Sequence, residues 1–184
     1  MEDRVVMAMV DTPLGPMAAG ARPDGLCLFE FSDPNRLQTQ VEAMRRRFRC
    51  PVVTGDSPYL DQLRDELRDY FAGRRTRFSI PLLAPGTPFQ ERVWARLLEI
   101  PYGQTISYEE LAVSVGAPGS QRAVGTANGS NRIAILIPCH RVINKSGKLG
   151  GYGGELWRKQ ALLTLERGGQ PSLYTPLTGS SATL

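Results

Sequence analysis

Three short apolar runs, separated by two turns rich in proline and glycine, occupy the first thirty residues. In the first run Val5, Met7 and Met9 alternate with other residues, which is the period of a half-buried β-strand. The predicted strands are residues 5–9, 17–21 and 26–31, and the turns are residues 12–16 and 22–25. Because short turns join them in sequence, these strands predict an antiparallel meander.

A helical period follows the strands. Asp33-Pro34 begins a helix with proline at its first position, and Ser57-Pro58 begins a second helix that ends at Gly73. The inward faces are Leu37, Val41, Met44 and Phe48 in the first helix, and Leu60, Leu63, Leu67 and Tyr70 in the second. Residues 1–78 are therefore predicted to form a small α/β domain. Cys27, inside the third strand, is interpreted as a small buried hydrophobic residue.

The second half of the chain has the pattern of short helices. After a linker predicted at residues 79–87, Thr87 and Gln90 form a capping box, and Ser107 and Glu110 form another. The helix that Ser107 opens ends at Gly116, and a further helix follows at about residues 120–127. Two short helices joined by a glycine-containing turn are typical of a helix-turn-helix. We predict a DNA-binding domain at residues 88–169 and a disordered tail at residues 170–184.

Composition narrows the class of protein. The chain has 184 residues, 41% of them hydrophobic and 22% charged, which is an ordinary globular balance. Neither a membrane span nor a signal peptide is expected. Three cysteines and one histidine are too few and too scattered for a zinc site or a disulfide framework. The cysteine content therefore suits a reducing cytoplasm.

The net charge of +4 belongs to the second half of the chain. No acidic residue lies between Glu110 and Glu155. That stretch carries Arg122, Arg132, Arg141, Lys145 and Lys148. An acid-free basic segment is either the footprint of a polyanion such as nucleic acid or a solvated surface, and charge alone favours neither.

Cys139 and His140 are the one neighbouring pair that is suited to nucleophilic chemistry. A reactive thiol needs a base that removes its proton, and His140 is the only histidine. Residues 133–137 predict a buried strand that leads into this pair. On a regular strand the two side chains would point to opposite faces, so a functional pair needs a local turn, which Pro138 would mark, or a bridging water. The alternative is a buried cysteine beside an unrelated histidine.

The run from Ile135 to Val142, Ile-Leu-Ile-Pro-Cys-His-Arg-Val, resembles the acceptor motif of the O6-alkylguanine-DNA alkyltransferase family. Flanking motifs agree in order: Pro101-Tyr102-Gly103, Ser107-Tyr108, Arg122-Ala123-Val124-Gly125, Asn131, Gly150-x-Tyr152-x-Gly154 and Glu166. The first domain matches more weakly, through Thr12-Pro13-Leu14-Gly15. The resemblance implies a ribonuclease-H-like α/β domain followed by a winged-helix-like helix-turn-helix domain.

The resemblance also implies roles for individual residues. Cys139 would accept the alkyl group from guanine O6, and His140 would take the thiol proton through a water. Glu166 would orient His140, and Asn131 would hold the turn before the acceptor. Tyr108 would give a proton to the departing guanine.

The target atom lies inside duplex DNA, so the resemblance implies that the base is flipped out through the minor groove. Arg122 would fill the gap. The expected DNA-contacting residues are Arg122, Ala123, Thr126, Ala127, Gly129 and Ser107, and the expected pocket residues are Pro138, Tyr152, Gly153 and Gly154. The protein would act once, as a cytoplasmic monomer with no cofactor or metal. Clustering on DNA stays open.

Departures from the family pattern leave the range of lesions open. Gly153 stands where many members have a small hydroxyl residue or alanine. Residues 128–130 also depart from the pattern, at the end of the second helix of the helix-turn-helix. Methyl or bulkier groups, and O4-alkylthymine as well as guanine, remain candidate substrates. Three other functions remain: a relative that only flags damage, which would lack Cys139, a winged-helix regulator, and a cysteine hydrolase.

Overall fold

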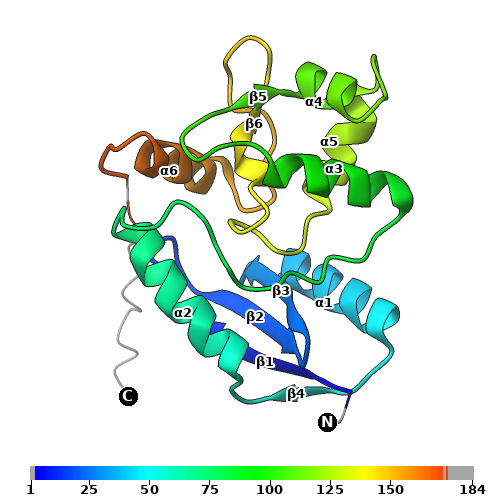
Figure 1. Cartoon of the computed structure of the whole chain (residues 1–184), viewed down its shortest axis with the longest axis vertical. Coiled ribbons are helices and arrows are strands. Elements are labelled where there is room, and N and C mark those ends of the chain that lie inside the picture. Colours follow the sequence, from blue (N-terminus) through cyan, green and yellow to red (C-terminus); the bar gives the residue numbers. More distant parts are fainter. Residues whose placement is uncertain (1–2, 172, 174–184) are drawn as a thin grey trace, which may run out of the picture.

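The N-terminal half is built on a four-stranded sheet (Figure 1). This computed structural model describes residues 3–171 and 173. The strands are β1 (Val5–Val10), β2 (Met17–Arg22), β3 (Gly25–Phe31) and β4 (Val52–Thr54), in the order β3-β2-β1-β4. The predicted antiparallel meander is confirmed for β1, β2 and β3. Strand β4, parallel to β1, was not predicted, because a three-residue edge strand with largely exposed side chains leaves no hydrophobic pattern.

Two helices cover opposite faces of this sheet. They are α1 (Pro34–Phe48) and α2 (Pro58–Phe71), and each has proline at its first position, as predicted. On one face Met44 of α1 packs with Cys27 and Leu28. On the other face α2 packs on the larger core that contains Phe29. Strand β3 is therefore buried along its whole length, which confirms the predicted burial of Cys27.

The C-terminal half is a set of short helices above the sheet (Figure 1). Its elements are α3 (Pro88–Leu98), β5 (Ile106–Ser107), α4 (Tyr108–Ser114), α5 (Gln121–Gly129), the 3₁₀ helix η1 (Cys139–Arg141), β6 (Val142–Ile143) and α6 (Leu156–Glu166). Both predicted capping boxes form, at Thr87 and at Ser107. Gly116 and Gly119 take positive φ angles of 73° and 82° in the turn between α4 and α5. This turn lets the two helices pack on each other as a helix-turn-helix.

The strand predicted at residues 133–137 is wrong. Only Ile133 makes a β-bridge, to Phe29, and the chain then folds back through a hydrogen bond from Ile137 N to Ile133 O. Ile135 lies at φ 70°, a left-handed conformation that is costly for a β-branched residue. These residues are apolar because both halves of the molecule bury them, and burial alone does not distinguish a strand from a compact turn.

One hydrophobic core spans both halves of the chain. The backbone of Phe29 in β3 accepts from Ala134 N and donates to Arg132 O, at 2.7 and 2.8 Å. Arg158 of α6 donates to Leu14 O and pairs with Asp33 of the N-terminal half. The sheet therefore fixes the turn that precedes Cys139.

The division at residues 78 and 88 stays a prediction. Residues 172 and 174–184 of the predicted tail lie outside the described residues. Among the residues that the structure describes, no helix is long and apolar enough to span a membrane.

The N-cap of α4 gives a stability test. The Ser107 hydroxyl accepts from Glu110 N at 3.1 Å, whereas Ser120, at the start of α5, makes no side-chain cap bond. Ser107→Ala is expected to lower the free energy of unfolding by about 1 kcal/mol. Ser120→Ala, the matched control, should change it by less than about 0.5 kcal/mol. Urea unfolding measures both, and equal effects would contradict the capping role.

Candidate functional site

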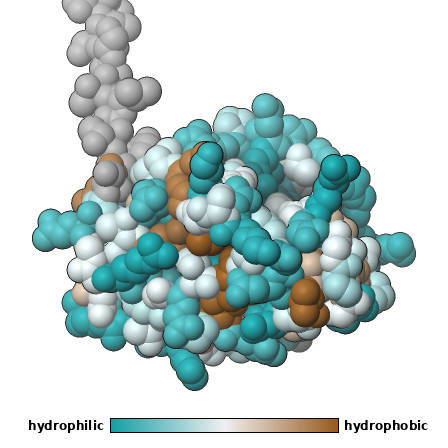
Figure 2. Space-filling model, turned by 90° about the horizontal axis from the view of Figure 1, so that it is seen from above, coloured by the Kyte–Doolittle hydropathy of each residue, from teal (hydrophilic) through white to brown (hydrophobic). Residues whose placement is uncertain are grey.

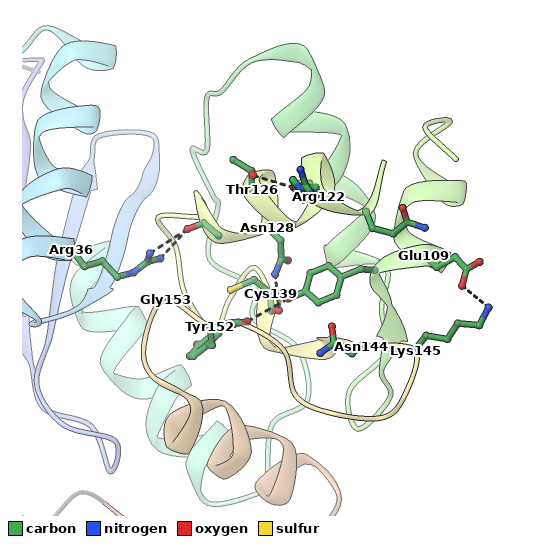
Figure 3. Close-up of a pocket in the computed structure, with 15 residues that line it drawn as sticks. Arg36, Glu109, Arg122, Thr126, Asn128, Cys139, Asn144, Lys145, Tyr152 and Gly153 are labelled. Carbon is green, nitrogen blue, oxygen red and sulfur yellow. Dashed lines mark hydrogen bonds and ion pairs between the residues drawn. The ribbon is translucent and has the colours of Figure 1, made fainter. Parts of the chain in front are cut away.

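A cavity of about 790 Å³ opens between the helix-turn-helix and the loop before α6 (Figure 3). The side chain of Arg36 reaches this cavity from α1, in the N-terminal half of the chain. The lining residues include Arg36, Tyr108, Arg122, Thr126, Asn128, Gly129, Cys139, Asn144, Lys145, Gly151, Tyr152 and Gly153. At one rim, Lys145 pairs with Glu109 at 2.7 Å. Segments that are distant in the sequence therefore surround one cysteine.

Cys139 lies in the wall of this cavity and is only 5% exposed. It begins η1, so Cys139 and His140 lie on a tight turn and not on a strand, as the position of Pro138 suggested. The Asn131 side chain donates to Cys139 Sγ at 3.2 Å. Burial raises the pKa of the Cys139 thiol, while the hydrogen bond from Asn131 acts in the opposite direction. A base is therefore needed to populate the thiolate.

His140 is fully buried and bonded to Glu166. Its Nε2 lies 2.8 Å from Glu166 Oε1. Because an ionised carboxylate only accepts hydrogen bonds, Nε2 carries the proton and Nδ1 holds the free lone pair. Among the described residues, Nδ1 has no hydrogen-bond partner. The basic nitrogen of His140 is therefore the one that Glu166 leaves free.

Glu166 accepts hydrogen bonds from four residues in three parts of the chain. Besides His140, the Arg141 guanidinium contacts both of its oxygens at 2.9 Å, Gly103 N donates at 3.2 Å, and Tyr70 OH donates at 2.7 Å. Burial would raise the pKa of Glu166, but the bonds and charges of His140 and Arg141 outweigh it and hold the pKa well below its usual range. Glu166 is therefore an anion at neutral pH.

Burial is the largest influence on His140 and lowers its pKa, although Glu166 acts in the opposite direction. The charge of Arg141 adds to the lowering. The imidazole is therefore neutral at neutral pH and able to accept a proton.

Asn131 holds the turn before the cysteine, as its predicted role requires. Its Nδ2 donates to Ile137 O at 2.9 Å, and its Oδ1 accepts from Ile133 N at 2.9 Å. The side chain is 1% exposed, so these bonds are shielded from water. The same amide reaches Cys139 Sγ, which couples the shape of the turn to the position of the sulfur.

Two tyrosines face the cavity. Tyr108 begins α4, and its hydroxyl donates to Gly151 O at 3.3 Å. Burial raises the pKa of Tyr108, so the phenol keeps its proton. The Tyr152 hydroxyl is buried and has no partner among the described residues. It is thus a polar group that a bound molecule would satisfy.

Lys159 of α6 supports the loop that carries Tyr152. Its ammonium group donates to Val142 O at 2.6 Å and to Gly151 O at 3.3 Å. Burial lowers the pKa of Lys159 to about 8. The loop and the start of β6 are therefore joined by one buried cation.

Arg36 is the lining residue from the N-terminal half, and sequence reasoning missed it. It donates to Gly129 O and Asn131 O and pairs with the buried carboxylate of Glu30 at 2.9 Å. A Cβ on Gly153 would collide with its guanidinium, so a larger residue there would require the Arg36 side chain to shift. The one signal in the sequence is weak: a basic residue in the first turn of α1 opposes the helix dipole.

Four of the residues predicted to contact DNA or the base are buried and do not line the cavity. Ser107 is buried as the N-cap of α4, and Ala127 is 3% exposed, with its carbonyl accepting from Trp94 Nε1. Gly154 packs against Phe31. Pro138 faces another depression, beside Arg141. Their burial is the structural observation, and their expected contacts with DNA or with the base stay predictions.

The remaining residues predicted to contact DNA are exposed on α5. They are Arg122, Ala123, Thr126 and Gly129. Seen from above, the surface of the molecule is largely hydrophilic, with a few apolar residues near the centre of the view (Figure 2). Small side chains on this face leave the backbone of α5 accessible to a groove.

The basic segment is less exposed than its charge suggested. Arg132 and Arg141 are 8% and 7% exposed, and bind Pro85 O and Glu166. Only Arg122, Lys145 and Lys148 of the five remain at the surface. Among the described residues, no group of three acidic, histidine or cysteine side chains is placed to hold a metal.

Two family models cover most of the chain. Residues 5–84 match the ribonuclease-like domain of 6-O-methylguanine DNA methyltransferase, and residues 88–168 match its DNA binding domain. The methylated-DNA--protein-cysteine methyltransferase of Mycobacterium tuberculosis is 45% identical over 166 residues, which span 90% of this chain and 94% of that protein. The constitutive enzyme of Bacillus subtilis is 38% identical over 158 residues, 85% of this chain and 92% of that protein.

The chain is also similar to solved structures. The crystal structure of Mycobacterium tuberculosis OGT in complex with DNA has a TM-score of 0.76 and 42% identity, and the match covers 92% of this chain and 96% of that one. The match includes both halves, so the arrangement of the two halves is shared.

The protonation of His140 can be measured directly because it is the only histidine. At pH 7 we expect a neutral imidazole with the proton on Nε2, read from long-range ¹H–¹⁵N NMR. Its pKa should lie below about 6.5, the ordinary value, which the urea-unfolded chain should show as a control. Because the folded pKa is the lower one, His140 favours the folded state above about pH 6.5 and destabilises it as the pH falls. An imidazolium at pH 7 would contradict this assignment.

Proposed function

The chain belongs to the O6-methylguanine DNA methyltransferase family, which repairs DNA directly by moving the methyl group to a cysteine of the protein itself, and we propose that this cysteine is Cys139. The observation that carries the proposal is that Cys139 lines the cavity next to the His140–Glu166 pair. The other two thiols lack such surroundings. Cys27 is buried in the sheet against Met44, and Cys50 lies beside Arg22, outside the cavity.

His140 is proposed as the base. Its free nitrogen, Nδ1, takes the thiol proton through a water, while Glu166 keeps Nε2 protonated and stabilises the imidazolium that forms. Arg141 and Gly103 fix the carboxylate, so the imidazole does not rotate. The buried Nδ1, without a protein partner, supports this route.

The thiolate then displaces guanine from the methyl group in line. The S–C bond forms as the C–O6 bond breaks, and the bonding pair remains on the guanine. Tyr108 is proposed to donate its phenolic proton toward guanine N3, so the base leaves neutral. The raised pKa of Tyr108 supports this role, because the group is protonated when the base arrives. Tyr152 and the backbone at Gly153 are proposed to hold the base.

DNA is proposed to lie along α5. Arg122 enters the stack and replaces the flipped base, and the small residues Ala123, Thr126 and Gly129 let the helix approach the minor groove. Exposure of these four residues supports the arrangement. Because phosphate contacts supply much of the affinity, binding should weaken with salt.

The product is a thioether, which is a poor leaving group. We therefore propose one transfer per molecule, with no cofactor. A cytoplasmic location is also proposed, since the substrate is DNA and the three cysteines are free thiols. Activity on bulkier groups and on O4-alkylthymine is a further proposal, supported only by the size of the cavity.

Intact mass spectrometry tests the acceptor. After reaction with duplex DNA that carries one O6-methylguanine, the protein should gain one methyl group per molecule, mapped by peptide analysis to Cys139. Cys139→Ser should gain none, and Cys50→Ser, the matched control, should gain the same as the wild type. Methylation that persists in Cys139→Ser would overturn the assignment. Repeated turnover would favour a hydrolase, and lesion binding without mass gain would favour a damage-flagging protein.

Arg122 gives a test of base flipping. Arg122→Ala should slow transfer from a duplex by about tenfold or more, because the vacated stack is no longer filled. Transfer from the same lesion in a single strand should change far less. Arg92→Ala on α3, an exposed arginine outside the cavity, is the control and should leave both rates unchanged. Equal slowing on single and double strands would contradict insertion.

A further inference from the structure

The N-terminal half of the chain contributes a hydroxyl group to the charge network of the site. Tyr70 of α2 donates to Glu166 Oε1 at 2.7 Å, across 96 positions of sequence. The side chain is fully buried. Its ring packs against Phe71, Phe78 and Tyr102, with centroids 5.3 to 5.9 Å apart. This aromatic cluster fixes the direction in which the hydroxyl points.

The oxygen that Tyr70 contacts is the one that His140 uses. His140 Nε2 lies 2.8 Å from Oε1, whereas Gly103 N and Arg141 Nε bind Oε2. A donor to a carboxylate stabilises its charge and makes it a weaker partner for a neighbouring cation. Tyr70 therefore competes with a protonated His140 for the same oxygen.

We propose that Tyr70 is a positioning residue of the methyl-transfer site, through which the N-terminal half holds Glu166 and keeps His140 neutral. The proposal rests on the role of His140 as the base. It gives the N-terminal half a chemical part in the reaction, beside its mechanical support of the turn before Cys139.

Packing alone does not explain the hydroxyl. A phenylalanine would fill the aromatic cluster equally well, and a buried hydroxyl without a partner is costly. The groups that face the pair from all sides are Tyr70 of α2, Tyr102 after α3, Arg141 of η1 and Lys159 of α6, which acts on His140 through its charge. No hydrogen bond from Tyr102 to the carboxylate is present in the described structure, so Tyr70 is the phenol that donates.

The hydrogen bond from Tyr70 to Glu166 can be tested through the pKa of His140, in the absence of DNA. In Tyr70→Phe the carboxylate loses one donor and attracts the imidazolium more strongly. The pKa of His140 should therefore rise by about 0.5 to 1, a threefold to tenfold change in the protonation equilibrium. NMR titration of the single histidine in the full chain measures it. Tyr59→Phe is the matched control: the same change on the same helix, at a hydroxyl with no partner in the described structure, should leave the pKa unchanged.

The pH dependence of the methyl-transfer rate provides a second test of the proposal. Because His140 must be neutral to accept the thiol proton, the acidic limb of the transfer rate in Tyr70→Phe should move to higher pH by the same amount. At pH values below the pKa of His140 the variant should be about threefold to tenfold slower than the wild type, and at pH values well above that pKa the two rates should converge. A loss that is equal at all pH values would overturn the proposal in favour of a purely structural role.

A replacement that strengthens the hydrogen bond distinguishes the proposal from a folding defect. With 3-fluorotyrosine at position 70 the phenol is more acidic and a stronger donor, so the pKa of His140 should fall. An unchanged pKa in both folded variants would overturn the proposal. Failure of the proposed function is a separate outcome: if Cys139 is not methylated, the mass experiment reports it while the pKa of His140 still responds to Tyr70.

Discussion

The buried carboxylate of Glu166 is the interaction on which the site depends. An isolated buried anion is costly, and it is tolerated only where cations and hydrogen bonds surround it. Here five donor bonds from Tyr70, Gly103, His140 and Arg141 do so. The carboxylate thereby joins the N-terminal half to η1 and to the turn at Gly103 that follows α3. Removing any partner would leave charge uncompensated, so the geometry around His140 is strongly specified.

The position of Cys139 also depends on contacts from the surrounding structure. The turn before Cys139 includes a strained Ile135, and such a conformation persists only where surrounding contacts determine it. Asn131 supplies bonds within the turn, and Phe29 clamps it from the sheet. Arg36 adds bonds to two carbonyl groups at the end of α5. The thiol proposed as the acceptor is thus held by both halves of the molecule, while the outer face of α5, the proposed DNA contact, stays exposed.

Much of the positive charge is used internally. Arg132, Arg141 and Arg158 are buried and bind carbonyl or carboxylate oxygens, and Lys159 binds two carbonyl groups. These cations organise the interior around the cavity, so the charge on the DNA-facing surface is modest. That arrangement suits a protein in which shape and insertion, more than a dense basic patch, bring the damaged base to the thiol.

The sequence by itself determined what depends on neighbours along the chain. The meander, the starts of α1 and α2, and both capping boxes follow from turn residues, periodicity and side-chain-to-backbone bonds a few positions apart. The family resemblance also predicted that His140 and Glu166 pair, and their side chains lie 2.8 Å apart. Only the tertiary structure decided that the apolar run before Cys139 is a turn, that Ser107 and Ala127 are buried, and that Arg36 and Tyr70 reach the site. Those outcomes depend on contacts across many positions, 96 for Tyr70 and Glu166, which no local pattern records.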